Sequence, residues 1–314
     1  MFNFIFGSDP EFMITNENRL KSAIKLLPPK ENSIKDKGNE FYYDNVLAEI
    51  AIKPSFNKNE AIENFRDSLK FLSKEIFPNK IKICAASFFP EEEIDCKQAK
   101  RASCNPEYSA YTLSLVSPPS NLIEQKEDYY QFKTNLRTSG GHIHLGSDFL
   151  NDGINKINVV RMMDLFIAIP SLFLECETKS KKRRSCYGMA GTHRIPDQKG
   201  RLEYRTLSNF WLQSPEHVSL IYDLCDFVLN FVSQEKHKKF WDFDSKIKTD
   251  DVSKAHICHG YDVNALVSCI NNCDKKQAEK FMIIVENFLE KEILVKIFDL
   301  IDKKNKNLNE SWSF

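Results

Sequence analysis

The sequence predicts an α+β protein in which a curved, largely antiparallel sheet carries helices on its outer face. Four segments that alternate apolar and polar residues keep their charged or imidazole side chains on one parity. Successive side chains of a strand point to opposite faces, so these groups would share a face. Longer segments repeat apolar residues at helical spacing and can cover the other face. We therefore expect a sheet with one polar face and one covered face.

Composition argues against several function classes. The 314 residues include 44 basic and 44 acidic side chains, so the net field offers no long-range attraction for nucleic acid or an anionic membrane. The nine cysteines are scattered and odd in number, with no CxxC pair, which favours a reducing compartment. The short N-terminus lacks a basic leader, and the apolar run 165–174 is too short to span a bilayer. We expect a soluble cytoplasmic protein with no nucleic-acid or membrane partner.

The first strand candidate covers residues 2–12. Phe4, Phe6 and Phe12 share one parity, whereas Asp9 and Glu11 share the other. Pro10 lies between the two acids and cannot donate a hydrogen bond to a neighbouring strand. We therefore expect this strand to lie at an edge or to bulge at Pro10.

The next elements are predicted from the same strand-like and helical spacings of apolar residues. Residues 46–53 form a strand candidate with Glu49 on its polar side, where a buried carboxylate would need a partner. Residues 59–77 show helical spacing, with Asn59 as the expected N-cap. Residues 81–88 are expected to form a strand and residues 20–37 a loop.

The stretch 137–146, which reads RTSGGHIHLG, is the least ordinary part of the chain. As a strand it places the His142 and His144 rings on one face, and Ile143 and Leu145 on the other. The glycines before the pair leave little bulk, which could give a ligand room beside the strand. Histidine is a common metal ligand but also an ordinary strand residue.

The second half of the chain continues with a helix over 159–175 that we expect to be disturbed at Pro170. A basic, glycine-containing loop over 179–200 follows. Residues 201–207 then form a strand with Glu203 and Arg205 on its polar side. A helix opened by Pro215 and helical periods over 262–302 are expected to provide an amphipathic cover.

The charged groups of these four strands suit a divalent cation bound to phosphate. Carboxylate oxygens match Mg²⁺, and a ring nitrogen is tolerated by Mn²⁺. Arginines hold phosphate oxygens in bidentate fashion, so Arg183, Arg184 and Arg194 are candidates. Arg137 either contacts phosphate or makes a structural pair. A nucleotide site here would lack a P-loop, because no GxxxxGK[ST] occurs.

Six motifs together resemble the phage-type COOH-NH2 ligases, a family of amidoligases related to glutamine synthetase and glutamate–cysteine ligase. The resemblance covers about residues 1–235 in order. The motifs are GSDPEF at 7–12, AEIAI at 48–52, CNPEYSAYT at 104–112, RTSGGHIHLG at 137–146, RRSCYGMAGTHR at 183–194 and RLEYRTLSNFW at 201–211.

The resemblance implies a curved antiparallel sheet that forms a catalytic funnel, and ATP-dependent formation of an amide or peptide bond through an acyl phosphate. It implies ATP and Mg²⁺, with Mn²⁺ as an alternative, and a carboxylate and an amine as substrates. The amine or acid would be an amino acid, a peptide or a protein side chain. A catalytic domain over 1–240 would carry a helical extension over 241–314 packed on the same domain.

The resemblance also assigns roles by motif. The metal ligands would be Asp9, Glu11, His142 and Glu203, although Asp9 replaces the glutamate of better-known relatives. His144 would lie nearer the nucleotide, together with Arg183, Arg184 and Arg194. The catalytic group would be Arg205, Arg137 and Glu49.

Two other functions fit parts of the pattern. A metal hydrolase could use the HxH pair and the acids to hold zinc and activate water. A non-catalytic phage or binding protein could retain a degenerate ligase fold, as Asp9 and Pro10 would suggest. His256, Cys258 and His259 are zinc-ligand types, but no fourth ligand with suitable spacing is evident. A ligase would have to keep its acyl phosphate from water, and the loop 179–200 is the expected lid.

Overall fold

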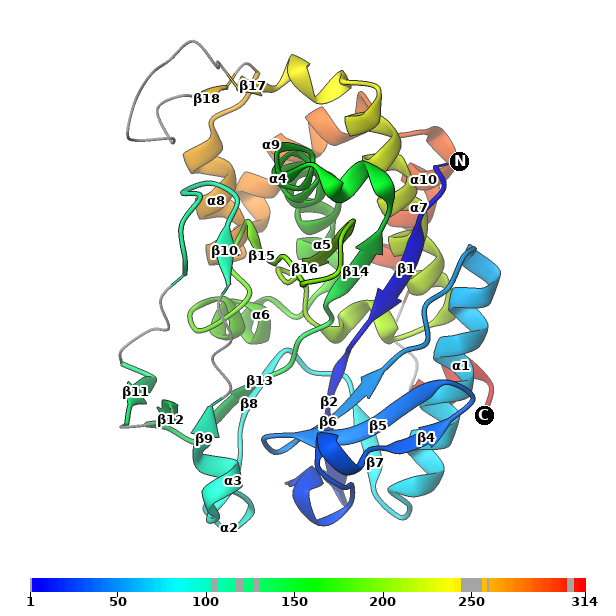
Figure 1. The fold of residues 1–314 in the computed structure, drawn as a ribbon, viewed down its shortest axis with the longest axis vertical. Helices are drawn as coiled ribbons and strands as arrows, with labels where there is room; N and C mark the ends of the chain where they lie inside the picture. The colour runs from blue at the N-terminus through cyan, green and yellow to red at the C-terminus, as the bar shows by residue number, and fades with distance from the viewer. Residues whose placement is uncertain are drawn as a thin grey trace.

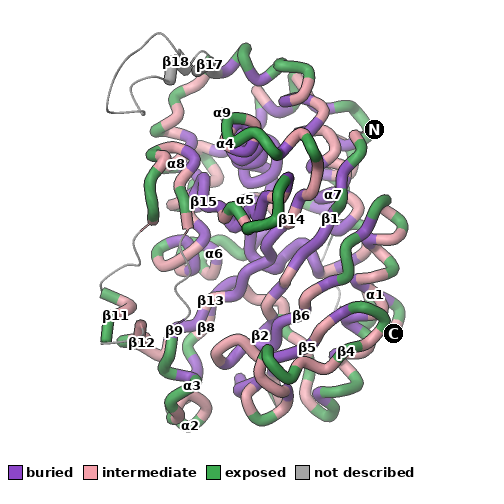
Figure 2. Tube along the Cα trace, viewed as in Figure 1, coloured by how far each residue is buried: buried purple, intermediate pink, exposed green. Residues whose placement is uncertain are grey.

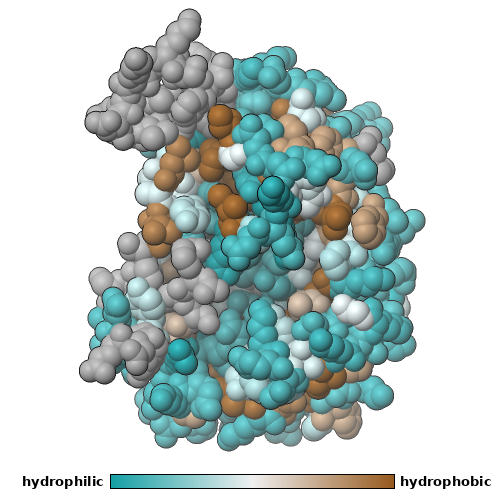
Figure 3. Space-filling view, in the orientation of Figure 1, coloured by the Kyte–Doolittle hydropathy of each residue, from teal (hydrophilic) through white to brown (hydrophobic). Residues whose placement is uncertain are grey.

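The computed structural model describes residues 2–102, 107–116, 121–126, 130–243, 256–258, 260–303 and 308–314. Two antiparallel sheets follow one another, with most of the helices behind the first and α1 beside the second (Figure 1). The face drawn in Figure 3 is largely hydrophilic, and hydrophobic side chains gather mainly around α8 and β10. The α+β class and the curved antiparallel sheet expected from the sequence are confirmed.

The two sheets contain most of the strands. The five-stranded sheet runs in the order β1 (Ile5–Ser8), β14 (Ile143–Gly146), β16 (Arg201–Tyr204), β15 (Thr192–Arg194) and β10 (Tyr108–Ser109). The second runs β3 (Arg19–Lys21), β2 (Glu11–Asn16), β6 (Leu47–Ala51), β5 (Asn39–Asp44) and β4 (Ile34–Asp36), with β7 (Lys80–Lys82) on β2.

The sheets join at Asp9 and Pro10, where the single N-terminal strand expected from the sequence divides into β1 and β2. The Pro10 carbonyl accepts a hydrogen bond from Ile50 N at 3.1 Å, and the Ser8 carbonyl accepts one from Ile52 N at 3.0 Å. Residues after β6 therefore continue beside β1. The result is one bent surface, and proline occupies the bend because it has no N–H to donate.

Helix α1 (Lys58–Glu75) packs its apolar stripe, which includes Phe65, Leu69 and Leu72, into the core. Its N-cap is Asn57, whose side chain accepts from Glu60 N, so Asn59 was the wrong expectation by two residues. Helix α7 (Pro215–Ser233) begins at the predicted proline, and Ser214 caps it. The C-terminal helices are α8 (Val263–Asn272), α9 (Lys275–Glu286), α10 (Lys291–Asp302) and α11 (Leu308–Trp312).

The most apolar helix spans Gly153–Leu174 and changes its winding midway. It consists of α4 (Gly153–Met163), a π-helical segment (Asp164–Ala168) and α5 (Ile169–Leu174). The wider turn lies just before Pro170, which cannot donate a helical hydrogen bond and would crowd the preceding turn of a regular helix. Its length and composition would allow a membrane span, but 83% of its most apolar window is buried inside the protein. It is therefore the core helix of this fold.

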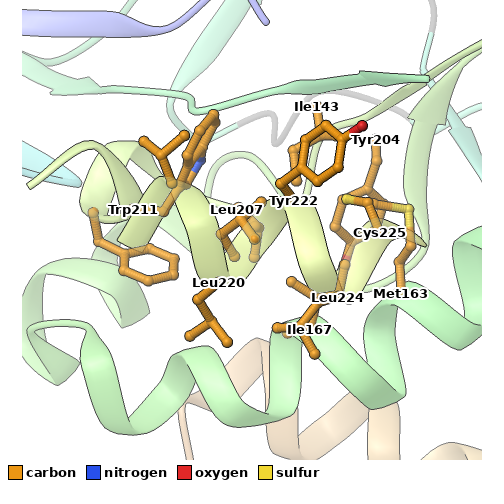
Figure 4. Packing of buried hydrophobic residues seen from close by; sticks show 14 of the residues in the cluster. Ile143, Met163, Ile167, Tyr204, Leu207, Trp211, Leu220, Tyr222, Leu224 and Cys225 are labelled. Carbon is orange, nitrogen blue, oxygen red and sulfur yellow. The ribbon is translucent and has the colours of Figure 1, made fainter. Parts of the chain in front are cut away.

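The core lies between the first sheet and these helices. Ile143 and Leu145 of β14 are fully buried, as the alternation predicted. Figure 4 shows Ile143 and Tyr204 above Leu220 and Leu224 of α7, with Ile167 of the apolar helix below. Figure 2 shows the same buried band running through β1, β14 and α5. Leu266 of α8, Phe281 of α9 and Ile297 of α10 belong to the same hydrophobic cluster.

Three expected segments differ from the structure. Residues 81–88 contain parts of two strands, β7 and β8 (Ala86–Phe88), and β8 pairs with β13 (Leu136–Thr138). The expected loop 179–200 contains most of helix α6 (Glu177–Arg184) and all of β15. Residues 20–37 contain the end of β3, two 3₁₀ turns and β4. The remaining short elements are α2 (Glu91–Ile94), α3 (Lys97–Lys100), β9 (Arg101–Ala102), β11 (Ile123–Gln125), β12 (Tyr130–Phe132), β17 (Trp241–Phe243) and β18 (His256–Cys258).

Candidate active site

A cavity of about 340 Å³ lies where the two sheets join, within the usual size range of small-ligand sites. Its polar lining includes Asp9, Glu11 and Glu49 from the first two strand candidates, and His142 and Arg205 from the others. Each predicted polar strand face therefore contributes at least one side chain to this cavity.

The first group of possible metal ligands is Asp9, His144 and Glu203, whose ligand atoms all lie within 4.8 Å of one another. We call this the imidazole group. Strand register explains it, since His144 lies directly opposite Glu203 in the β14–β16 pair. The Nε2 atom of His144 is 3.2 Å from Asp9 Oδ1 and 3.9 Å from Glu203 Oε2. This buried nitrogen has no aligned hydrogen-bond partner among the described residues.

Histidine and arginine side chains surround the two carboxylates of the imidazole group. Burial alone would raise the pKa of the Asp9 carboxyl, but the His144 and His142 rings lower it well below its usual range. Burial would likewise raise the pKa of Glu203, and Arg205 and His142 lower it. Both carboxylates are therefore ionised in the metal-free protein.

His142 occupies a different place from the one expected. Its Nδ1 lies 2.8 Å from Asp9 Oδ1, and its Nε2 lies 2.5 Å from the Tyr187 hydroxyl. Burial and the nearby Arg205 lower the pKa of His142, so the ring is neutral and donates through Nδ1 to the carboxylate. His144, and not His142, offers a ring nitrogen to the imidazole group.

The glycines before the histidines serve the protein's own packing. A Cβ on Gly140 would lie 2.3 Å from His142 Nε2, and one on Gly141 would lie 2.4 Å from the Ser208 carbonyl oxygen. The expected room for a ligand beside the strand is thus taken by the His142 ring and by the backbone at Ser208. Gly140 N also donates to Glu11 Oε2 at 2.5 Å.

The second group of possible metal ligands is Glu11, Asp44 and Glu49, again with ligand atoms within 4.8 Å of one another. We call it the carboxylate group. Glu11 on β2 faces Glu49 on β6 in register, and Asp44 ends the adjoining strand β5. Tyr42 donates to Glu49 Oε1 at 2.6 Å. Glu49, expected to be catalytic, is placed by this geometry among the candidate metal ligands.

The carboxylate group resists ionisation. Burial and the charge of Asp44 raise the pKa of Glu11 to about 7. Burial, with Asp9 and Asp44 nearby, raises the pKa of Glu49 well above its usual range, and burial also raises the pKa of Asp44. Three hard oxygen donors that repel one another fit a divalent cation, which would relieve the repulsion.

Arg205 lines the cavity and contacts Glu203 of the imidazole group. It is buried and donates to Glu107, Glu203 and the Tyr187 hydroxyl. A guanidinium has five N–H groups, so two have no hydrogen-bond partner among the residues that the structure describes. Arg194 also lines the cavity, with its NH1 3.6 Å from Glu203 Oε1.

Three other arginines singled out in the sequence serve the fold. Arg137 lines the cavity, but four of its N–H groups are engaged, with Asn45 and with backbone carbonyls including Ala99. Arg183 donates to the carbonyls of Ser139, Arg205 and Thr206. Arg184 pairs with Glu175 and contacts Cys273. Arg183 and Arg184 do not line the cavity, and a contact of theirs with nucleotide stays a prediction from the sequence.

Sequence reasoning missed four residues of the site: Asp44, Glu107, Tyr187 and Arg201. Tyr187 bridges His142 and Arg205, and no periodic pattern marks it because it follows α6 in a turn. Glu107 and Tyr187 do lie inside motifs noted above, CNPEYSAYT and RRSCYGMAGTHR. Arg201 shares the parity of Glu203 and Arg205, which could have revealed it. Only Asp44 lacks a local signal.

Two further expectations concern neighbouring segments. The proposed lid, residues 179–200, begins with a helix whose Arg183 and Arg184 are buried, so its first part is anchored to the body of the protein. Of the possible zinc ligands, His256 and Cys258 lie on β18, and His259 lies outside the described residues.

Part of the chain matches a known protein family. Residues 131–251 match the family described as phage phiEco32-like COOH.NH2 ligase-type 2. The resemblance is confirmed for this stretch. It contains His142, His144, Glu203 and Arg205, whereas Asp9, Glu11, Asp44 and Glu49 precede it. The match supports a carboxylate–amine ligase as the function class.

A solved structure is also similar to this chain, a bifunctional glutathione synthetase from Pasteurella multocida, with 11% identity and a TM-score of 0.44. The alignment covers 99% of this chain and 48% of the synthetase, so the chain spans about half of that protein's length. No curated protein matches the chain by sequence. Function is therefore inferred from the family match and from the site.

Proposed function

We propose that this protein is an ATP-dependent carboxylate–amine ligase that forms an amide or peptide bond through an acyl phosphate. The observation that carries the proposal is the pair of ligand groups beside one cavity, with Arg205 and Arg194 next to them. Phosphoryl transfer demands charge neutralisation and positioning more than a covalent nucleophile. Acids and arginines around one cavity meet that demand.

The donor atoms fit divalent cations. Asp9, His144 and Glu203 would hold one, and Glu11, Asp44 and Glu49 another. Mg²⁺ or Mn²⁺ bound there would neutralise the ATP phosphates and the charge that develops on transfer. The three acids of the carboxylate group line the cavity, and the imidazole group reaches it through Asp9.

The chain's own residues would orient the reacting groups. The substrate carboxylate attacks the γ-phosphorus of ATP, ADP leaves, and the acyl phosphate forms. The amine then attacks the acyl carbon, loses a proton and expels inorganic phosphate. Arg205 would hold the transferring phosphoryl group through its two remaining N–H groups, while Glu107, Glu203 and Tyr187 fix its guanidinium.

The substrates would be small carboxylates and amines or protein side chains bearing them. The cavity lining also includes the apolar side chains Val116, Ile123 and Phe132, which suit an uncharged part of a ligand. A reducing cytoplasm is the proposed location, supported by the seven described cysteines, which are all free thiols. The helices after residue 260 are proposed to extend the catalytic domain, since they share its core.

The test is ADP release with Mg²⁺ over a panel of amino acids, peptides and polyamines. We expect ADP formation that depends on both a carboxylate and an amine, and its loss by at least 100-fold in Glu11→Gln, as expected for a residue that holds a metal. Glu63→Gln is the matched control, because this exposed carboxylate of α1 lies outside the cavity.

Two results would overturn the proposal. One is a well-folded protein that binds no ATP in the presence of Mg²⁺. The other is full activity of Glu11→Gln. Hydrolysis of amides without nucleotide, with zinc retained through purification, would instead indicate the metal hydrolase considered from the sequence.

A further inference from the structure

Arg201 at the start of β16 makes an unusual contact with a candidate metal ligand. Its NH2 lies 2.9 Å from His144 Nδ1, and its NH1 donates to Gln198 Oε1 at 2.8 Å. Arg201 precedes Glu203 by two residues, so both side chains share a face of β16, with His144 opposite Glu203. The guanidinium is thus diagonal to the ring across the strand pair.

This contact fixes where the ring holds its proton. A guanidinium has donors and no acceptor, so His144 Nδ1 must present its lone pair to Arg201. A neutral ring with an unprotonated Nδ1 carries its hydrogen on Nε2. A doubly protonated ring would place two N–H groups against each other at 2.9 Å. Nε2–H therefore faces Asp9 and Glu203 at 3.2 and 3.9 Å.

That arrangement is the reverse of what a metal-binding histidine needs. Ligating imidazoles offer an unprotonated nitrogen to the metal and donate the other N–H to a carboxylate, carbonyl or water. In this protein the nitrogen that faces the two acids carries the proton. The other nitrogen already accepts from a cation. His144 cannot bind a cation through Nε2 while Arg201 occupies Nδ1.

We propose that Arg201 is a positioning residue that holds His144 in the tautomer unable to bind metal, and that cation binding releases the Arg201 guanidinium. The release of Arg201 on cation binding rests on the function proposed above. The exchange balances, because Nε2 gives a proton to water while Nδ1 takes one from water, and the ring stays neutral. The freed guanidinium then lies at the rim of the imidazole group with its donors available to an anionic ligand.

The first experiment needs no metal. Long-range ¹H–¹⁵N spectra of histidine-labelled, metal-free protein report which ring nitrogen carries hydrogen, and His144→Gln assigns the signals. We expect an unprotonated Nδ1 in the wild type and proton uptake at Nδ1 in Arg201→Met. A protonated Nδ1 in the wild type, or an unchanged Nδ1 in Arg201→Met, would overturn the inference.

The second experiment separates the effect of the hydrogen bond from Arg201 to His144 from the effect of the positive charge of Arg201. Mn²⁺ binding is measured by electron paramagnetic resonance for Arg201→Met and for Arg194→Met, which removes a charge near Glu203 without a recorded contact to His144. We expect about a tenfold gain in Mn²⁺ affinity for Arg201→Met, the lower end for changes behind a ligating histidine. This gain should vanish in the His144→Gln background, whereas any gain from Arg194→Met should persist.

The outcomes distinguish the two proposals. A gain from Arg201→Met that survives in the His144→Gln background would mean that Arg201 acts only through its charge, and the inference fails. A wild type that binds no Mn²⁺ would remove the proposed metal site and with it the release of Arg201. The tautomer assignment from the first experiment would be decided independently. Thermal unfolding of each variant shows whether the fold is retained.

Discussion

The imidazole group and the carboxylate group lie beside the same cavity but differ in how their charge is balanced. Asp9 and Glu203 have two histidines and two arginines as neighbours, and their pKa values are lowered despite burial. Burial raises the pKa values of Glu11, Asp44 and Glu49, and repulsion from neighbouring carboxylates adds to the rise. At Asp44 the cations Lys30, Arg194 and Arg205 oppose this rise without cancelling it. Positive partners therefore outweigh burial in the imidazole group, whereas burial and repulsion prevail in the carboxylate group.

This difference predicts which of the two groups responds to pH and to Mg²⁺. A group that is already paired is part of the stable fold, and removing its partner exposes a buried charge. A group whose burial and repulsion outweigh its positive neighbours exchanges protons for cations, so pH and Mg²⁺ act on it together. The two groups therefore predict opposite responses to substitution and to pH.

The largest effect is expected from Arg205→Met, which removes the main partner of the imidazole group. The substitution leaves Glu107 and Glu203 buried without their guanidinium. Breaking a buried pair from one side typically lowers the free energy of unfolding by about 3 to 5 kcal/mol. Urea unfolding at neutral pH measures the change.

The control for Arg205→Met is Lys37→Met, which removes a cation from an exposed pair with Asp67. Exposed pairs contribute at most about 1 kcal/mol. If Arg205→Met cost no more than this control, the imidazole group would not depend on its arginine, and the contrast between the two groups would be lost.

The next effect concerns the pH dependence of the carboxylate group. The folded protein holds a proton on Glu11 up to about pH 7, because burial and Asp44 raise its pKa from the ordinary 4.5. A raised pKa stabilises the fold below the unfolded pKa, and this stability is lost as pH rises toward 7. The loss is on the order of 3 kcal/mol for a shift of this size. Metal-free protein should therefore lose stability over this range, and Glu11→Gln should lose less.

Asp9→Asn tests the opposite pH dependence of stability, which is expected for the imidazole group. Because the pKa of Asp9 is lowered by His144 and His142, its contribution is present above the unfolded pKa and lost on acidification below it. Asp9→Asn should flatten only the acid limb of the stability curve.

For the carboxylate group, saturating Mg²⁺ should remove the loss of stability between pH 4.5 and 7 in the wild type. A Glu11→Gln curve parallel to the wild type would refute the assignment.

Local periodicity predicted much of this site. Alternation in residues 2–12, 46–53, 137–146 and 201–207 placed the charged side chains on the correct face, because strand parity depends only on neighbouring residues. The same reasoning found α1 and α7 from their apolar stripes and caps. It separated the buried Ile143 and Leu145 from the histidines.

Features that depend on contacts between distant segments could not be predicted from local periodicity. Arg183 looks like a phosphate ligand in the sequence, and only the fold shows its N–H groups on the carbonyls of Ser139, Arg205 and Thr206. Asp44 ends a strand with no local sign of its role, since its partners come from β2 and β6. Spacing alone does not show which of the two histidine rings joins the acids, because register with Glu203 decides it.

The smallest effect tests the joint between the two groups. Gly140 donates its N–H to Glu11 of the carboxylate group, and its missing Cβ makes room for the His142 ring that donates to Asp9. Gly140→Ala would push the ring, held by Asp9 and Tyr187, out of place and cost about 1 to 3 kcal/mol, as overpacking does. Gly153→Ala is the control, because nothing lies within 4 Å of its added Cβ. If the two groups are coupled through Gly140, its alanine variant should change both the acid limb and the loss of stability toward pH 7. A change in only one of them would show that the groups titrate independently although they share a cavity.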